Sequence, residues 1–164
     1  MRKPFILLIP LMLLTTGCTH WISEQSRAAA DLTVNFSQLR ENPDAWRGKL
    51  VLLGGTVAAV TRTREGTRLE IVEYSLDSRE LPDTVNPSRG RFLAYLPGSL
   101  DSDRYKPNAL ITLIGEVTGM NVQPLAEEEN IYPVIAVREI QVIELPEIHP
   151  EYDYGNDHHF RHMR

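Results

Sequence analysis

The chain of 164 residues carries 17 basic and 22 acidic residues, a formal net charge of −5, and a single cysteine. This length suits one folded domain with flanking segments. The acidic balance argues against a nucleic-acid partner, because such binding depends on cations that neutralise phosphates, and a single cysteine excludes a disulfide within the chain.

The first seventeen residues have the pattern of a bacterial export signal. Arg2 and Lys3 give it a positive start, and residues 5–14 are apolar. That apolar stretch is shorter than the roughly twenty residues a helix needs to cross a bilayer. The sequence LLTTGC at residues 13–18 then resembles a lipobox, the processing motif of bacterial lipoproteins, although Thr15 stands where Leu is commonest. The alternative is an ordinary signal peptide with an incidental cysteine.

On the lipobox interpretation, residues 1–17 are removed and Cys18 is acylated as the new N-terminus. A cysteine modified in this way cannot serve as a nucleophile, a metal ligand or half of a disulfide. Acyl chains contribute about 0.8 kcal/mol per buried CH₂, so two or more of them anchor a protein stably. Thr19 follows, rather than the Asp that retains lipoproteins of enteric-type bacteria in the inner membrane. We therefore predict an outer-membrane location, with outer-membrane lipid as the partner of acylated Cys18.

Residues 18–34 are polar to mixed in composition and are predicted to form a lipidated tether. Trp21 and Ile22 could rest at the membrane surface, since an indole has an apolar body and a polar N–H group that suit the headgroup level. A flexible leader with an incidental tryptophan is the alternative.

Residues 35–145 have the pattern of a small β-domain. Ser37 is a candidate N-cap, and Phe36 and Leu39 give an apolar face to one or two helical turns, which Pro43 ends. Apolar and β-branched residues then predict five strands, at residues 49–63, 68–74, 91–96, 110–120 and 132–145.

Gly54 and Gly55 lie in the middle of the first predicted strand, where they would permit a bulge or bend in a coiled barrel strand. An irregular insertion separates the third and fourth strands. These features predict a mainly β fold: a small five-stranded OB-like antiparallel barrel with a short N-terminal helix, a lipid-anchored tether and a disordered C-terminal tail. Closure of the barrel would also remove exposed strand edges. A β-sandwich or an open antiparallel sheet is the alternative.

Several segments carry a family resemblance. The segments VNFSQLRENPDAWRGKLVLLGGTV, EGTRLEIVEYSLD, GRFLA, ITLIGEVTG and YPVIAV resemble the Slp family of outer-membrane lipoproteins, which is named for induction on starvation. The match covers most of residues 34–143 and includes the lipobox, and the tail beyond Leu145 is left outside it. The resemblance implies a stress or starvation link, no established enzymatic activity, and no functional residue apart from the lipidated Cys18.

The predicted domain offers few groups for catalysis. Residues 35–145 contain neither His nor Cys, which excludes Ser-His and Cys-His nucleophilic schemes and the usual zinc ligand sets there. We predict no catalytic, cofactor-binding or metal-binding residue. Carboxylates on the predicted strands could still converge, although most such groups are solvated surface residues; they are Glu70, Glu73, Glu116 and Glu139.

Arginines are frequent between residues 62 and 91, where acidic residues are equally frequent. Guanidinium groups suit bidentate contacts with lipid A phosphates or an acidic glycan, but the mixture of signs favours a salt-bridged surface. The six arginines are Arg62, Arg64, Arg68, Arg79, Arg89 and Arg91.

Residues 146–164 are predicted to be a flexible tail that contains histidines. His158 and His162 would share one face of a helix near Asp157, which is a spacing compatible with weak transition-metal binding. A disordered tail with incidental histidines is the favoured interpretation.

Together these features predict a non-enzymatic binding or structural role in the cell envelope, with the β-domain facing the periplasm. The predicted partner is an unidentified envelope protein or glycan, and no nucleic acid is expected. An OB-type binder of an envelope glycan or of lipopolysaccharide phosphate is the alternative, and a carboxylate-based envelope hydrolase is the second alternative.

Overall fold

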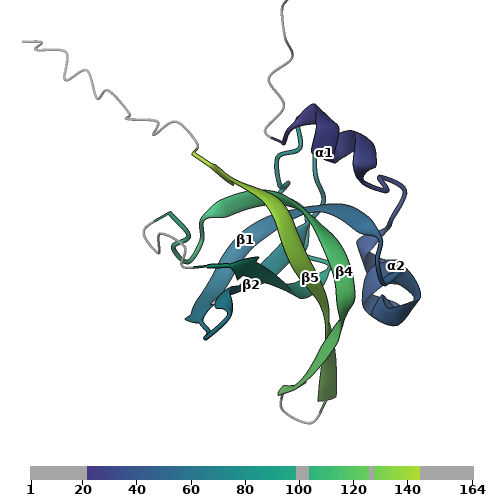
Figure 1. Cartoon of the computed structure of the whole chain (residues 1–164), viewed down its shortest axis with the longest axis vertical. Helices are drawn as coiled ribbons and strands as arrows, with labels where there is room; N and C mark the ends of the chain where they lie inside the picture. The colour runs from purple at the N-terminus through teal and green to yellow at the C-terminus, as the bar shows by residue number, and fades with distance from the viewer. Residues whose placement is uncertain (1–21, 99–103, 126–127, 145–164) are drawn as a thin grey trace, which may run out of the picture.

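The computed structural model describes residues 22–98, 104–125 and 128–144, with residues 122–125 and 128–129 described by their backbone alone. Within them the chain forms two short α-helices, a 3-10 turn and five β-strands (Figure 1). The prediction of a mainly β fold is therefore confirmed. In chain order the elements are α1 (Glu24–Ala29), α2 (Phe36–Glu41), η1 (Pro43–Trp46), β1 (Leu50–Arg62), β2 (Gly66–Tyr74), β3 (Gly90–Pro97), β4 (Leu110–Leu125) and β5 (Glu128–Ile143).

All five predicted strands are present, and the first three agree with the prediction to within two residues at each end. β4 continues past the predicted end at residue 120, and β5 begins before the predicted start at residue 132. These additional residues pair with each other and form a hairpin that projects from the barrel (Figure 1). The sequences of these residues, NVQPL and EENI, contain a proline and two consecutive glutamates, which are uncommon within strands.

The five strands close into a barrel in the order β1-β2-β3-β5-β4, which confirms the predicted OB-like architecture. β1 pairs antiparallel with β2 along one edge and with β4 along the other. The barrel is closed by β3 and β5, which run parallel from the pair Leu93–Val134 to the pair Tyr95–Ala136. The prediction described the barrel as antiparallel, and the other four neighbouring pairs are antiparallel. A closed ring of five strands cannot alternate direction at every step, so at least one neighbouring pair must be parallel.

The interior of the barrel is apolar. Along β2, Leu69 and Ile71 are fully buried, whereas Glu70 between them is partly exposed, as expected of a strand with one face inside. α2 contributes Phe36 and Leu39 to the same cluster, and the ring centroids of Phe36 and Phe92 are 6.0 Å apart. Fully burying one such side chain stabilises the fold by about 1.5–3 kcal/mol, so α2 is held in place by its apolar face.

The start of α2 differs by two residues from the prediction. Asn35, rather than Ser37, is the N-cap: its side-chain oxygen accepts a hydrogen bond from the Ser37 amide at 2.9 Å. Asn and Ser are both good N-cap residues, so the sequence alone did not show which of the two begins the helix. α2 ends at Glu41 and Pro43 begins η1, in agreement with the predicted stop.

The segment that was predicted to be a tether is folded from Ile22 onward. Ile22 is 1% exposed, and is therefore packed within the protein rather than available to a membrane surface. Ser23 caps α1, and its amide and hydroxyl donate hydrogen bonds to the Glu139 carboxylate at 2.7 and 2.6 Å. The Asp31 amide donates to the Leu50 carbonyl at 2.8 Å. The chain thus joins the barrel well before residue 35.

The glycines of β1 allow close approach rather than a bend. Neither Gly54 nor Gly55 has a positive φ, and the register shift between β1 and β2 lies further along, between Val57 and Ala59. A Cβ on Gly55 would overlap the carbonyl oxygen of Val72 on β2. A Cβ on Gly54 would overlap the side chain of Leu76, in the loop that covers β1. The predicted reason for these glycines is therefore wrong, because the strand needs them for space.

We predict that Gly55→Ala lowers the free energy of unfolding by more than about 2 kcal/mol, because the added methyl group meets backbone that cannot move aside. Gly48→Ala is the matched control, since Gly48 has open space around its Cβ position and a φ of +77°, so that it carries only left-handed strain of about 1–2 kcal/mol. Urea denaturation of both variants measures the difference. An equal or smaller loss for Gly55→Ala would contradict the close packing of β1 on β2.

Candidate functional site

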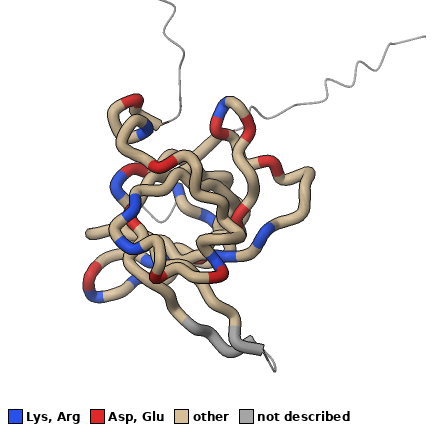
Figure 2. Tube along the Cα trace, turned by 90° about the vertical axis from the view of Figure 1, so that its right-hand side faces the viewer, with Lys and Arg blue, Asp and Glu red and all other residues tan. Residues whose placement is uncertain are grey.

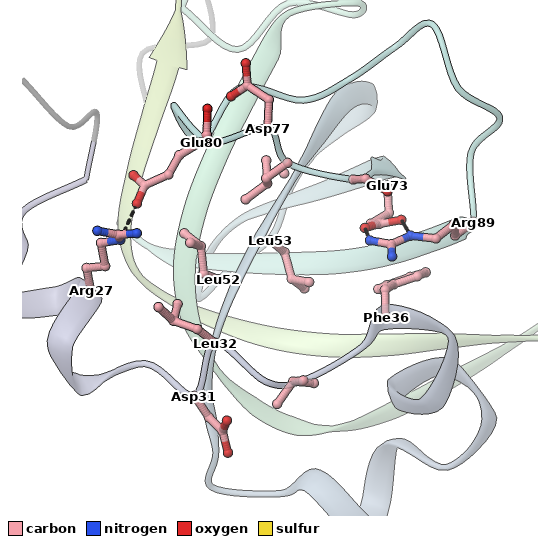
Figure 3. A pocket seen from close by; sticks show the side chains of 15 residues that line it. Arg27, Asp31, Leu32, Phe36, Leu52, Leu53, Glu73, Asp77, Glu80 and Arg89 are labelled. Carbon is pink, nitrogen blue, oxygen red and sulfur yellow. Dashed lines mark hydrogen bonds and ion pairs between the residues drawn. The ribbon is translucent and has the colours of Figure 1, made fainter.

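The largest concentration of buried charge surrounds a cavity of about 320 Å³ beside β1 (Figure 3). One wall is the N-terminal segment from α1 to α2, and the opposite wall is the end of β2 with the loop that joins it to β3. The side chains that line it are Arg27, Asp31, Leu32, Val34, Phe36, Leu52, Leu53, Glu73, Ser75, Leu76, Asp77, Ser78, Glu80 and Arg89, together with Gly54.

Glu73 lies at one side of this cavity and is buried, with 1% of its surface exposed. It occupies an inward-facing position of β2, one alternation beyond Ile71, where an apolar residue would be expected. Arg89 holds it through two hydrogen bonds: Nε donates to Oε2 at 3.0 Å, and Nη2 donates to Oε1. Burial raises the pKa of Glu73 above its ordinary value, and the hydrogen bonds and charge of Arg89 offset this rise only in part.

A second ion pair lies at the other side of the cavity (Figure 3). Nε of Arg27, from α1, is 2.6 Å from Oε1 of Glu80, whose side chain is 4% exposed. Glu80 has a φ of 65°, a left-handed conformation that is uncommon for residues other than glycine. Its carbonyl accepts a hydrogen bond of 2.6 Å from the hydroxyl of Thr112 on β4. The loop conformation is thus fixed from two sides, by α1 and by the barrel.

Two further carboxylates at the cavity have lowered pKa values. The side chain and amide of Thr33 donate hydrogen bonds to Asp31 and lower its pKa, and the charge of Lys49 adds to this effect. The pKa of Asp77 is lowered by amide hydrogen bonds, that of Leu81 first and that of Arg79 next. Both groups are therefore ionised near neutral pH. The lining itself holds four carboxylates against two guanidinium groups and is net negative, while the mostly exposed Lys49 and Arg79, which lie outside it, are 3.9 Å from Asp31 and 3.5 Å from Asp77.

Leucines form an apolar floor between the two ion pairs (Figure 3). Leu52 and Leu53 come from β1, Leu76 from the covering loop and Leu32 from the N-terminal segment. Both arginines already contact carboxylates, so the cavity has little positive charge to offer an anion. An apolar surface with a net negative border suits a ligand that has an apolar part and a cationic group.

The four strand carboxylates that could have formed an active site do not converge. Glu73 is buried at the cavity, whereas Glu70 pairs with Arg91 at 2.6 Å on the partly exposed side of β2. Glu116 pairs with Arg138 of β5. Glu139 binds Ser23: burial alone would raise its pKa, but the hydrogen bonds from Ser23 and Ser26 outweigh this and lower it. Each of these four carboxylates therefore contacts a different partner.

Positive and negative residues are interspersed around the barrel, as expected from the sequence (Figure 2). Of the six arginines between residues 62 and 91, Arg89 and Arg91 form the ion pairs described above, and Arg79 lies 3.5 Å from Asp77. Arg68 donates a hydrogen bond to the Thr61 hydroxyl at 3.4 Å. These four arginines thus make the salt-bridged or hydrogen-bonded contacts that the mixture of signs favoured.

Two further recesses, of about 230 and 350 Å³, lie beside the turn between β1 and β2. The larger one is lined by Tyr95 and Pro97 of β3 and by Val137 of β5, just beyond the point where β3 and β5 stop pairing. In OB-folds this turn and the β2–β3 face bind oligonucleotides and oligosaccharides. The glycan-binding alternative would therefore be located at this recess.

Several predicted features lie outside the described residues: Cys18, the signal peptide, and the tail with His149, His158 and His162. Within residues 22–98, 104–125 and 128–144, no group of three or more His, Cys, Asp or Glu side chains could hold a metal ion. In that same part of the chain, no helix is long and apolar enough to cross a membrane.

Sequence reasoning missed the N-terminal wall of the cavity, with Arg27 and Asp31. Two local signals were present. Ser23 followed by Glu24 marks a helix start, and Asp31 two residues before Thr33 marks a capped turn. The contacts of this segment with β5 and with the loop after β2 are distant in sequence, and no local pattern announces them.

We predict that the free energy of unfolding falls as the pH rises from about 4.5, the ordinary pKa of a glutamate, through the higher pKa of Glu73 in the folded protein. The folded state binds more protons than the unfolded state in this window, so raising the pH favours unfolding. Glu73→Gln should lack this pH-dependent loss of stability.

Arg89→Gln should raise the pKa of Glu73 further, as measured by carboxyl-carbon NMR. Arg91→Gln, which removes the partner of Glu70, should leave the pKa of Glu73 unchanged. A pKa of Glu73 at or below 4.5 would contradict this assignment.

Comparison with known proteins gives a family. The model of the outer membrane lipoprotein Slp family matches residues 15–162, and so includes the tail that the sequence-based resemblance left outside. Two curated relatives come from Escherichia coli (strain K12). Over 77 residues the chain is 39% identical to "Uncharacterized lipoprotein YeaY". This aligned region covers 47% of this chain and 39% of that protein. Over 129 residues the chain is 29% identical to "Outer membrane protein Slp". This aligned region covers 76% of this chain and 68% of that protein.

Neither name states an enzymatic activity. The first name gives a lipoprotein and the second gives an outer membrane protein, and the description of the family combines the two. Because the family model covers nearly all of the chain, this protein belongs to the outer membrane lipoprotein Slp family.

Proposed function

We propose that this outer-membrane lipoprotein binds a component of the cell envelope without transforming it chemically, and that the cavity beside β1 is the binding site. The observation that carries the proposal is the composition of the cavity: an apolar floor of leucines, two ion pairs and a net negative border. The ligand class that matches is a small amphiphile with an apolar chain and an amino group.

The state of the carboxylates supports a binding rather than a catalytic role. A general acid must reach the substrate, but Glu73 is 1% exposed and both of its oxygens are occupied by Arg89. Glu80 is similarly buried and contacts Arg27. Asp31 and Asp77 have lowered pKa values and are poor proton donors at neutral pH. The hydrolase alternative therefore has little geometric support.

The charge of the lining favours an amino group over a phosphate. A lipopolysaccharide phosphate needs guanidinium groups that are free to turn toward it, whereas Arg27 and Arg89 are each held by a buried carboxylate. An ammonium group would instead meet the ionised Asp31 and Asp77, whose own basic neighbours, Lys49 and Arg79, lie outside the lining and have side chains that are 58% and 76% exposed. The glycan alternative depends on a different place, the recess at Tyr95, where an aromatic ring is available for stacking against a sugar.

The test uses the soluble mature chain with Cys18→Ser and three probes that share one apolar tail: octylamine, octyl phosphate and octyl glucoside. Calorimetric titration should show octylamine binding at least several-fold more tightly than octyl phosphate. Leucine methyl signals in NMR spectra should shift at Leu52 and Leu53, which form the floor of the cavity.

Asp31→Asn should weaken octylamine binding several-fold, because it removes a charge while keeping an oxygen that can accept the Thr33 hydrogen bonds. Asp44→Asn is the matched control, since Asp44 lies on η1 and pairs with Arg47. Tighter binding of octyl phosphate would support the phosphate alternative, and octyl glucoside binding with shifts at Tyr95 would support the glycan alternative. No binding of any probe would overturn the cavity as a ligand site.

The stress or starvation link implied by the family resemblance is part of the same proposal. Comparison of protein levels in growing and starved cells tests it, and equal levels would contradict it.

A further inference from the structure

The distance from the lipid anchor to the folded domain is short. The described fold begins at Ile22, which is buried, and the lipidated residue is Cys18, four residues earlier. Four residues reach at most about 14 Å when fully extended. A folded unit of this size has a radius of gyration of about 14 Å, so the anchor cannot extend past the near side of the domain.

The near side can be identified from the fold. α1, which follows Ile22, and the end of β5 lie at one end of the molecule, and the β4–β5 hairpin projects from the other end (Figure 1). The loop that follows β2 belongs to the α1 end, because Arg27 contacts Glu80. Val85 of this loop lines a recess together with Ile143, the last residue of β5. We call these elements the anchor end.

The anchor end exposes apolar side chains. Leu32 is 54% exposed beside the cavity, and Val85 is 94% exposed in the loop between β2 and β3. Met120, which is 46% exposed, lies on the hairpin at the opposite end. Exposed Leu and Val side chains gain free energy when they leave water for the acyl boundary of a bilayer.

We propose that the anchor end lies flat against the lipid surface of the outer membrane, with Leu32 and Val85 in contact with lipid and the β4–β5 hairpin pointing away. The short tether keeps the anchor end close to the bilayer, and the side chains of Leu32 and Val85 make the contact with lipid. The cavity beside Leu32 then opens next to the lipid headgroups. This proposal depends on lipidation of Cys18 and not on the ligand of the cavity, so the two can fail separately.

The test uses the full acylated lipoprotein in vesicles of phosphatidylethanolamine and phosphatidylglycerol. Single cysteines are introduced by Leu32→Cys, Val85→Cys and Met120→Cys and carry a nitroxide label; Cys18 does not react because it is already modified. All three positions are exposed, so the label should leave the fold intact. Electron paramagnetic resonance then compares collisions with oxygen, which concentrates in lipid, and with a water-soluble nickel complex.

The ratio of oxygen to nickel collisions should be several-fold higher at positions 32 and 85 than at position 120. The same labels on the soluble Cys18→Ser chain without vesicles give the fully aqueous baseline. Baseline ratios at all three positions of the acylated protein would overturn the proposal, and would show that the domain stands away from the bilayer. A high ratio at position 120 would overturn it as well, because the opposite end would then face the lipid.

Discussion

Three polar contacts hold the N-terminal segment against the barrel, and the site depends on them. Ser23 binds the carboxylate of Glu139 on β5, Arg27 pairs with Glu80 in the loop after β2, and the Asp31 amide binds the carbonyl of Leu50 at the start of β1. Each hydrogen bond contributes about 0.5–1.5 kcal/mol net, so none is strong alone. They act together with the buried Ile22 to give the cavity one of its walls.

The barrel provides the rigid surface on which this segment and the opposite loop rest. β1 pairs along both edges, and Gly54 and Gly55 let the covering loop and β2 approach it closely. The loop is in turn tied down by the bridge between Leu76 and Pro82 and by the Thr112 hydroxyl. The two walls of the cavity, one from the N-terminal segment and one from the loop after β2, therefore both rest on β1. A cavity built in this way has fixed charges, which favours selective binding over adaptation to many ligands.

Local sequence patterns predicted the barrel well because they record one-sided burial. β2 alternates buried and partly exposed residues along its length, so its existence and its inward face follow from the sequence. The parallel closing pair follows from the odd number of strands, although we had predicted antiparallel pairing. The hairpin extension of β4 and β5 was not predictable from alternation, since its residues pair with each other outside the barrel.

The site itself was mostly beyond reach of the sequence. α1 contains no buried residue, so it has no apolar face to detect, and its stability comes from partners such as Glu139 that are 116 positions away from Ser23. Glu73 was recognised as a strand carboxylate, but its burial depends on Arg89 and on the loop between them. The reason for the two glycines of β1 was misread for the same cause, since only the packed structure shows which atoms approach them.

Amide hydrogen exchange of Asp31 in the mature lipoprotein tests most directly whether the N-terminal segment is part of the folded domain. Its amide is bonded to the Leu50 carbonyl at 2.8 Å, and we predict exchange slowed to a rate comparable with that of amides in β1. The amide of Ser23, bonded to Glu139, should also be slowed. Exchange of Asp31 at the rate of a free peptide, with β1 still protected, would show that the segment is a tether after all, and the cavity and the short anchor would lose their basis.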